Sequence, residues 1–249
     1  MLSWALNEEE NIRSFIERAE AFLTSAADDF ELVLIDDGST DRTAAIAAEY
    51  QASRPWLRLY ANDRNRGSGY SAKRAISLAR KDYLFWQTVD WSYDLTMLGP
   101  ALHLLARYDI LQGVRVNALS TTFFRTRSDT PSKAMISILN YLLIRVLFGL
   151  PLHDYQNVTV YPTRLIQSIH IESESAFTSP ECLLKVWWKG VTIKEVPVVF
   201  LKRERGDAKG TRVSAIRVAV RDVFRFWWRW VVRGQRLDHA RGTVARWDE

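Results

Sequence analysis

Glu31-Leu-Val-Leu-Ile-Asp-Asp-Gly-Ser-Thr-Asp41 is an apolar run that ends abruptly in two carboxylates, a glycine and a pair of hydroxyl side chains. The run is short and contains β-branched residues, so it predicts a β-strand. Its near-continuous hydrophobicity is typical of a parallel sheet that is covered on both faces. Asp36 and Asp37 then fall at the carboxyl end of the strand, where open α/β sheets bind their ligands. Gly38 permits the tight turn that follows.

The segments around this strand predict strands and helices in alternation. Such an order implies right-handed crossovers and a parallel sheet. Ser39 or Thr40 is expected to cap the helix that follows the central strand. The other expected strands are Met1–Leu6, Trp56–Tyr60, Tyr83–Asp90, Asp109–Arg115 and Val191–Phe200, and the expected helices include Glu9–Leu23, Thr43–Tyr50, Leu95–Tyr108, Ala134–Leu150 and Pro180–Lys189.

Composition bounds the class of protein. The chain has 249 residues, of which 47% are hydrophobic and 12% aromatic, values that fit one substantial core and argue against disorder. A single cysteine excludes an internal disulfide, and no apolar signal segment follows Met1. A reducing, cytoplasmic setting is therefore expected. No uncharged apolar run reaches the roughly 18 to 20 residues that span a bilayer.

The net charge of +5 is concentrated towards the C-terminal end, where thirteen Lys and Arg stand against six Asp and Glu from Leu201 onward. Between Val213 and Arg236, arginines recur at every fourth residue and tryptophans fall mainly on another side of the predicted helix. A basic face beside a Trp-rich apolar face is typical of a helix on an anionic membrane surface. In an alternative interpretation, the tryptophans pack on the rest of the protein or in an oligomer. The region has no nucleic-acid-binding motif, so no nucleic acid partner is expected.

Several motifs together resemble a known family. With Asn7-Glu-Glu-Glu-Asn-Ile12 before it, Asp36-Asp-Gly-Ser-Thr-Asp41 resembles the nucleotide-sugar site of family 2 glycosyltransferases, and most closely the branch that contains dolichyl-phosphate mannosyltransferase. The resemblance runs to about Lys209. It implies an α/β GT-A fold, with a mostly parallel nucleotide-binding sheet flanked by helices and a C-terminal amphipathic helix. Residues 1–210 would form the glycosyltransferase domain, and residues 211–249 a basic, Trp-rich helical tail.

The resemblance also implies roles for individual residues. Arg115 is expected to point at a donor or acceptor phosphate, which suits its charge and bidentate geometry. Glu181 lies where relatives present a carboxylate to the acceptor, although an acid at a helix N-terminus is also favoured by the helix dipole. The polar segment Thr121–Lys133 is expected to act as a lid. The expected donor-binding residues are Asn7, Glu8, Asp36, Asp37, Lys73, Arg203, Arg205 and Lys209.

The metal-binding Asp-X-Asp of the family reads Thr88-Val-Asp90 in this chain. Asp90 is therefore the expected catalytic carboxylate and the expected ligand of Mg²⁺ or Mn²⁺. Because hard cations prefer oxygen ligands, the loss of one acid predicts weaker metal binding. In an alternative interpretation, Asp90 only caps the turn that follows it.

The function that the resemblance implies is an inverting transfer of a sugar from a nucleotide-diphosphate sugar. The basic, Trp-rich segment Val213–Arg236 further predicts a polyprenyl (dolichyl or undecaprenyl) phosphate acceptor and a peripheral membrane enzyme on the cytoplasmic side. A lipid phosphate is already ionised, whereas a hydroxyl acceptor would need Glu181 or another carboxylate to take its proton. Two alternatives stay open. One is a glycosyltransferase for a saccharide or lipid hydroxyl, and the other is a non-catalytic nucleotide-sugar-binding protein, an alternative that is kept because Thr88 replaces an acid.

Overall fold

The computed structural model describes residues 1–116, 131–201, 213–235 and 240–247. The strands are β1 (Leu2–Ala5), β2 (Leu32–Asp36), β3 (Leu57–Ala61), β4 (Tyr83–Leu84), β5 (Tyr93–Asp94), β6 (Ile110–Val116), β7 (Thr159–Pro162), β8 (Thr192–Phe200) and β9 (Thr243–Ala245). The α-helices are α1 (Ile12–Ala26), α2 (Thr43–Gln51), α3 (Ser68–Leu78), α4 (Leu98–Ala101), α5 (Pro131–Phe148), α6 (Thr163–Gln167), α7 (Thr178–Trp187) and α8 (Val213–Trp227). Two 3₁₀ segments, η1 (Leu95–Met97) and η2 (Leu102–Ala106), flank α4, and a π-helical turn, η4 (Trp228–Val232), follows α8.

Two sheets lie at the centre of the molecule. One is parallel, in the order β1-β2-β3, and the other runs β4-β7-β6-β8-β5 with β9 paired to β8. In the second sheet β8 pairs in parallel with β6 and with β9. The pairs β4–β7, β6–β7 and β5–β8 are antiparallel. A parallel bridge between Leu2 and Trp86 joins the two sheets at β1. Taken together, the two sheets and the bridge contain more parallel than antiparallel pairings among the described strands, so the joined sheet is mostly parallel, as the sequence predicts.

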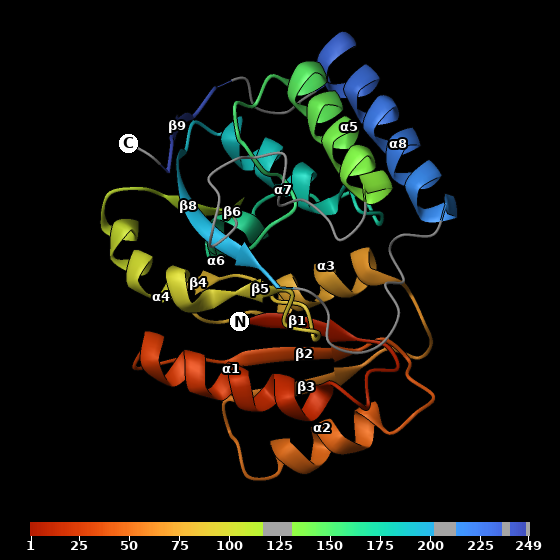
Figure 1. Cartoon of the computed structure of the whole chain (residues 1–249), viewed down its shortest axis with the longest axis vertical. Coiled ribbons are helices and arrows are strands. Elements are labelled where there is room, and N and C mark those ends of the chain that lie inside the picture. The colour runs from red at the N-terminus through yellow and green to blue at the C-terminus, as the bar shows by residue number, and fades with distance from the viewer. Residues whose placement is uncertain (117–130, 202–212, 236–239, 248–249) are drawn as a thin grey trace.

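Helices cover both faces of this sheet (Figure 1). The central strand β2 is buried along its whole length, and its alternate side chains enter two separate cores. Leu32 and Leu34 pack with α1 and α2, while Val33 and Ile35 pack with α3 and with the core that continues under α5, α7 and α8. This two-sided burial explains the near-continuous hydrophobicity of the strand.

The amphipathic helix predicted after the first strand is confirmed. α1 buries Ile12, Phe15, Ile16, Ala19 and Leu23, which lie at helical spacing on one face. The cap of α2 differs from the prediction, because Asp41, and not Ser39 or Thr40, accepts a hydrogen bond from the Thr43 N–H (2.9 Å).

Two predicted elements are shorter than expected. The strand predicted over Tyr83–Asp90 is regular only in β4, before the bridge at Trp86. The helix predicted over Leu95–Tyr108 is divided into η1, α4 and η2. Pro100 lies in this stretch and has no N–H to donate, which interrupts a continuous helix.

The C-terminal segment packs against the rest of the protein. Val223, Phe226 and Trp230 belong to the core beneath α5 and α7, and β9 extends the second sheet beside β8. Phe226 and Trp230 stack with their ring centroids 4.5 Å apart. The sequence pattern did not predict β9, because its partner strand lies far away along the chain.

Gly38 is required by both its backbone angle and its surroundings. Its φ is +75°, and a Cβ at this position would lie 2.5 Å from the backbone carbon of Arg64. We expect Gly38→Ala to lower the free energy of unfolding by more than about 2 kcal/mol, because strain from a positive φ adds to a backbone clash. Urea denaturation measures this loss.

Gly149→Ala is the matched control for this prediction. Gly149 has a φ of +73° but no atom within 4 Å of the added Cβ, so it should lose only about 1 kcal/mol from the positive φ. Equal losses in the two variants would contradict the role of the contact between Gly38 and the loop at Arg64.

Candidate active site

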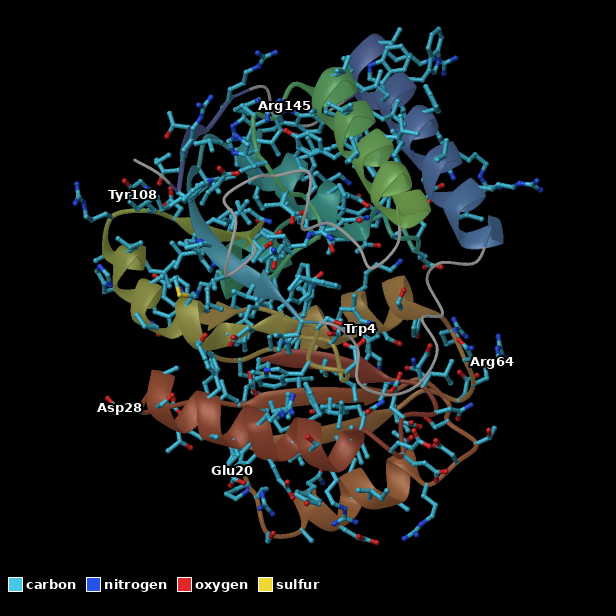
Figure 2. All side chains as sticks on the ribbon, in the orientation of Figure 1. Trp4, Glu20, Asp28, Arg64, Tyr108 and Arg145 are labelled. Atoms are coloured by element: carbon cyan, nitrogen blue, oxygen red, sulfur yellow. The ribbon has the colours of Figure 1, made fainter. Side chains whose placement is uncertain are left out.

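The predicted site residues lie mainly at one edge of the sheet. β1, β2 and β3 end there, and the bridge at Trp86 brings the segment before Asp90 alongside β1. Arg64, which follows β3, marks this side of the molecule in Figure 2. Because β6 runs in the same direction as β1, Arg115 lies towards this edge as well. The edge therefore carries Asn7 and Glu8 after β1, Asp36 and Asp37 at the end of β2, Asn62 after β3, Asp90, and Arg115 near the end of β6.

Asp37 organises the loop between β3 and α3. Its Oδ1 accepts hydrogen bonds from Asn62 Nδ2 (2.7 Å) and the Arg66 N–H (2.9 Å), and its Oδ2 accepts one from the Gly67 N–H (2.9 Å). The side chain is buried. Asp37 was predicted to hold the donor nucleotide; in the structure its carboxylate shapes the loop beside the edge.

Asp36 offers an acceptor atom at the same edge. Its Oδ2 accepts a hydrogen bond from the Ser39 N–H (3.2 Å). Its Oδ1 is buried and has no hydrogen-bond partner among the described residues. Buried carboxylate oxygens are nearly always satisfied, so this atom is a candidate acceptor for a donor group of a ligand.

Asn7 and Glu8 join the ends of β1 and β2. Asn7 has a φ of +50°, and its side chain accepts a hydrogen bond from the Thr40 N–H (2.8 Å). The Glu8 N–H donates to Thr43 Oγ1 (2.8 Å), and its carboxylate accepts from Asn11 Nδ2 (2.7 Å). These contacts connect the residues after β1 to the turn that follows Asp36 and Asp37.

Asp90 lies in a tight turn with Thr88. Its Oδ1 accepts hydrogen bonds from the Ser92 N–H (3.2 Å) and Oγ (2.6 Å), and Thr88 Oγ1 also accepts from the Ser92 N–H (3.1 Å). Trp91 has a φ of +54°, a strained value for a large side chain that is typical of functional sites. Among the described residues, no group of three or more His, Cys, Asp or Glu side chains could hold a metal ion.

Arg115 forms a bidentate ion pair with Asp154. Nε lies 2.6 Å from Asp154 Oδ2, and Nη2 lies 2.8 Å from Oδ1. Burial lowers the pKa of Arg115, but the Asp154 carboxylate outweighs burial and raises the pKa above its ordinary value. Tyr93 lies in the same electrostatic cluster: burial raises its pKa to about 12, Arg115 opposes the rise, and Asp154 and Asp90 add to it. The cluster therefore links the Asp90 turn with the end of β6.

Two predicted site residues, Lys73 and Glu181, contact the segment between α6 and α7. Lys73 Nζ lies 2.6 Å from Glu174 Oε1. Glu181 is 0% exposed, and its oxygens accept hydrogen bonds from the backbone N–H groups of Glu172 and Ser173. Three more predicted residues, Arg203, Arg205 and Lys209, lie outside the described residues, as does most of the predicted lid over Thr121–Lys133.

Sequence reasoning gave no role to Asn62 and Tyr93. Asn62 is the first residue after β3, so its place at a strand end could have identified it. Tyr93 had no such signal, because only the folded chain brings it into contact with the loop after α5. Its hydroxyl donates a hydrogen bond to the Gln156 carbonyl (2.7 Å).

Comparison with known proteins gives consistent matches. The model for Glycosyl transferase family 2 matches residues 4–165. The dodecaprenyl-phosphate galacturonate synthase of Rhizobium johnstonii is 30% identical over 211 residues, which cover 82% of this chain and 59% of that protein. Glycosyltransferase AglD of Haloferax volcanii is 26% identical over 230 residues, which cover 90% of this chain and 35% of that protein. The chain therefore spans between about a third and three fifths of these two relatives.

A solved structure shares the fold. It is glucosyl-3-phosphoglycerate synthase from Mycobacterium tuberculosis in complex with Mn²⁺, UDP-glucose and phosphoglyceric acid. The TM-score is 0.60 at 15% sequence identity, and the match covers 91% of this chain and 78% of that one. The shared architecture is the GT-A fold, as the sequence predicts.

Asp37→Ala tests the organising role of the Asp37 carboxylate. We expect the substitution to lower the free energy of unfolding by about 2–4 kcal/mol, because the buried Asn62 amide and two part-buried backbone N–H groups lose their acceptor and a buried donor left unpaired costs roughly 1–3 kcal/mol. Asp36→Ala is the control and should cost less, since it removes one hydrogen bond, from Ser39. Urea denaturation compares the two, and an equal or larger loss in Asp36→Ala would contradict this role.

Proposed function

The chain belongs to glycosyl transferase family 2, and from this membership we propose that it transfers a sugar from a nucleotide-diphosphate sugar to a polyprenyl phosphate at a membrane surface. The configuration at the anomeric carbon would be inverted. The observation that carries the proposal is that Asp36, the Asp37 loop, Asp90 and Arg115 all lie towards one edge of the mostly parallel sheet. Ligands of open α/β sheets bind at such edges.

The donor nucleotide would lie along the ends of β1, β2 and β3. Asp36 Oδ1, which lacks a partner among the described residues, would accept a hydrogen bond from the base or ribose. Asn7 and Glu8 flank it, and the N-terminus of α3 lies beside the Asp37 loop. A helix N-terminus favours anions, so the diphosphate would be stabilised at that end of the nucleotide.

A divalent metal fits this arrangement with few protein ligands. Mg²⁺ is often bound through one or two carboxylates together with substrate phosphates, and Asp90 supplies one carboxylate at the edge. Thr88 adds only a neutral hydroxyl, and Asp94 caps η1 by accepting the Thr96 N–H (3.0 Å). When bound, Mg²⁺ or Mn²⁺ would neutralise charge on the leaving diphosphate. Asp90 would therefore be the carboxylate that holds the metal at this edge.

The proposed reaction is an in-line displacement at the anomeric carbon. An acceptor oxygen forms the new bond to C1 while the bond from C1 to the diphosphate oxygen breaks, and the nucleoside diphosphate leaves with that electron pair. The guanidinium of Arg115 stays charged, and in its ion pair with Asp154 it would act beside the phosphates as an oriented hydrogen-bond donor, without adding a net charge. Asp154 holds this guanidinium in one orientation.

A phosphate acceptor agrees with the state of the carboxylates near the site. An ionised phosphate oxygen attacks without losing a proton, whereas a hydroxyl needs a general base. Glu181 is fully buried with backbone N–H groups on both oxygens, and Asp154 is paired with Arg115. Neither carboxylate is placed to take a proton from a hydroxyl, and the R. johnstonii relative is named for a dodecaprenyl-phosphate product.

The outer face of α5 and α8 suits a membrane surface. The two helices lie side by side (Figure 1), and α5 exposes apolar side chains such as Val146, which is 78% exposed. On α8 and η4, Phe224 and Trp228 are exposed near the exposed Arg221 and Arg225. Trp230, which was expected on the apolar membrane face, instead packs in the core. The proposed membrane face is therefore the opposite side of the helix.

None of the helices in the described part of the chain is both long and apolar enough to cross a bilayer. Contact with a membrane through α5 and α8 would be peripheral. Arginines near anionic lipid contribute about 1 kcal/mol each, and aromatic side chains such as Trp228 favour the interface.

Thr88→Asp tests the metal site. We expect the affinity for Mn²⁺ in the presence of a nucleoside diphosphate to rise roughly tenfold, because a second carboxylate adds an oxygen ligand and a charge. Isothermal titration calorimetry measures this affinity. Thr88→Asn is the matched control, since it has the same shape without the charge, and equal affinities in both variants would place the metal elsewhere.

Sugar transfer to polyprenyl phosphate tests the function and the membrane face together. Transfer from UDP-, GDP- or dTDP-sugars would be measured with the acceptor in anionic vesicles and, separately, in detergent micelles. We expect Arg221→Glu with Arg225→Glu to lower vesicle binding and vesicle transfer roughly tenfold or more, because each arginine contributes about 1 kcal/mol. Transfer in micelles should stay near the wild-type rate.

Arg13→Glu with Arg18→Glu is the control for this experiment. Both arginines are exposed on α1, away from α8 (Figure 1), and the change in net charge is the same. Equal effects of the two double variants would exclude α8 as the membrane face. Transfer to a soluble hydroxyl acceptor, with none to the lipid phosphate, would overturn the proposed acceptor.

A further inference from the structure

Segment 172–175 lies between α6 and α7 and packs against the start of α3. A Cβ added at Gly69 would lie 2.3 Å from the Cα of Glu174. Lys73, one turn further along α3, places its Nζ 2.6 Å from Glu174 Oε1. The backbone of α3 therefore touches this segment so closely that position 69 has no room for a side chain.

The same end of α3 is bonded to the candidate donor site. Gly67, directly before α3, and Arg66 donate their N–H groups to Asp37. Ser71 Oγ, in the first turn of α3, accepts a hydrogen bond from Asn62 Nδ2 (2.9 Å). A displacement of the start of α3 would therefore move the loop and the helix dipole that face the donor diphosphate.

Glu181 fixes the backbone of segment 172–175 from the side of α7. Its oxygens accept the N–H groups of Glu172 (2.8 Å) and Ser173 (2.7 Å), and Lys185 Nζ lies 2.6 Å from its Oε1. Glu181 is fully buried. A buried carboxylate with two backbone donors and a lysine defines one backbone conformation, because each lost contact would leave a buried polar group unsatisfied.

Glu172 fixes the segment from a second direction. Its carboxylate pairs with Lys185 of α7 (2.9 Å) and with Arg229 of η4. Burial raises the pKa of Glu172, but the hydrogen bonds from Arg229 and Lys185 outweigh burial and lower the pKa below its ordinary value. The segment is thus held by charged partners on two separate helical elements.

We propose that segment 172–175 holds the start of α3 in place at the donor edge, and that Glu181 and Glu172 are positioning residues for nucleotide-sugar binding. The effect passes from these two carboxylates through Glu174 to α3, and from α3 to the loop that Asp37 holds. The proposal rests on the proposed function, because a nucleotide sugar is the ligand whose affinity reports the position of that loop. Glu181 then acts on donor binding, without contact with the acceptor.

Kinetics at varied nucleotide-sugar concentration separate positioning from chemistry. We expect Glu181→Gln, Glu172→Gln and the exposed-site variant Glu174→Gln to raise the donor KM roughly two- to thirty-fold, the range seen for coupling through neighbouring residues. Their kcat should stay close to wild type. Loss of folded protein alone would lower the apparent kcat and leave KM unchanged.

Glu20→Gln is the matched control. Glu20 lies on α1 (Figure 2), which packs on the face of β2 opposite to α3 and α7, and the substitution removes its ion pair with Arg54 (3.0 Å). This variant should keep the wild-type KM and kcat.

Hydrogen–deuterium exchange of the ligand-free variants gives a readout that does not depend on activity. The amides of Arg66 and Gly67 should exchange faster in Glu181→Gln, Glu172→Gln and Glu174→Gln than in wild type and Glu20→Gln. A fall in kcat with unchanged donor KM, or exchange and KM values equal to those of Glu20→Gln, would overturn the proposal. If wild-type protein binds no nucleotide sugar, the proposed function fails, and the exchange rates alone decide whether segment 172–175 positions α3.

Discussion

The hydrogen bonds that the buried Asp37 carboxylate accepts connect the end of β2 to the residue after β3 and to the start of α3. An acid at this depth is stable only when its oxygens are satisfied, so the loop must close around it. Gly38 permits that closure, because its Cα faces the backbone of the same loop. The part of the edge between Asp36 and the start of α3 depends on this arrangement.

Aromatic packing in the C-terminal half holds α7, α8 and η4 together. Phe177, Phe226 and Trp230 stack between α7 and α8, and this aromatic core fixes the elements that carry Glu181 and Arg229. One side of α8 is therefore committed to packing, while its other side exposes arginines and aromatic side chains. The same helix can thus contribute to the stability of the core and to a surface suited to anionic lipid.

Much of the fold and part of the site could be predicted from local pattern. The apolar run before Asp36 and Asp37 identified the strand and the edge of the sheet at which the candidate site lies, and the helical spacing in α1 identified its buried face. Helix phase alone could not decide whether Trp230 or Trp228 faces the core, because both belong to apolar stripes. The inward orientation of Glu181 depends on a loop that brings the N–H groups of Glu172 and Ser173 back to its carboxylate, and no motif marks such a loop. The pairing of Arg115 with Asp154 joins residues far apart in the sequence, which no local pattern contains. β9 was missed for the same reason, since three residues gain strand structure only by pairing with β8.

A crystal structure of the protein with a nucleotide sugar and Mn²⁺ tests the central assignment most directly. We predict that the base and ribose lie at the ends of β1 and β2, within hydrogen-bond distance of Asp36 Oδ1. The diphosphate should lie between Asp90 and the N-terminus of α3, with Mn²⁺ bound to Asp90. A nucleotide bound away from this edge, or a metal without Asp90 among its ligands, would contradict the assignment of the edge as the donor site.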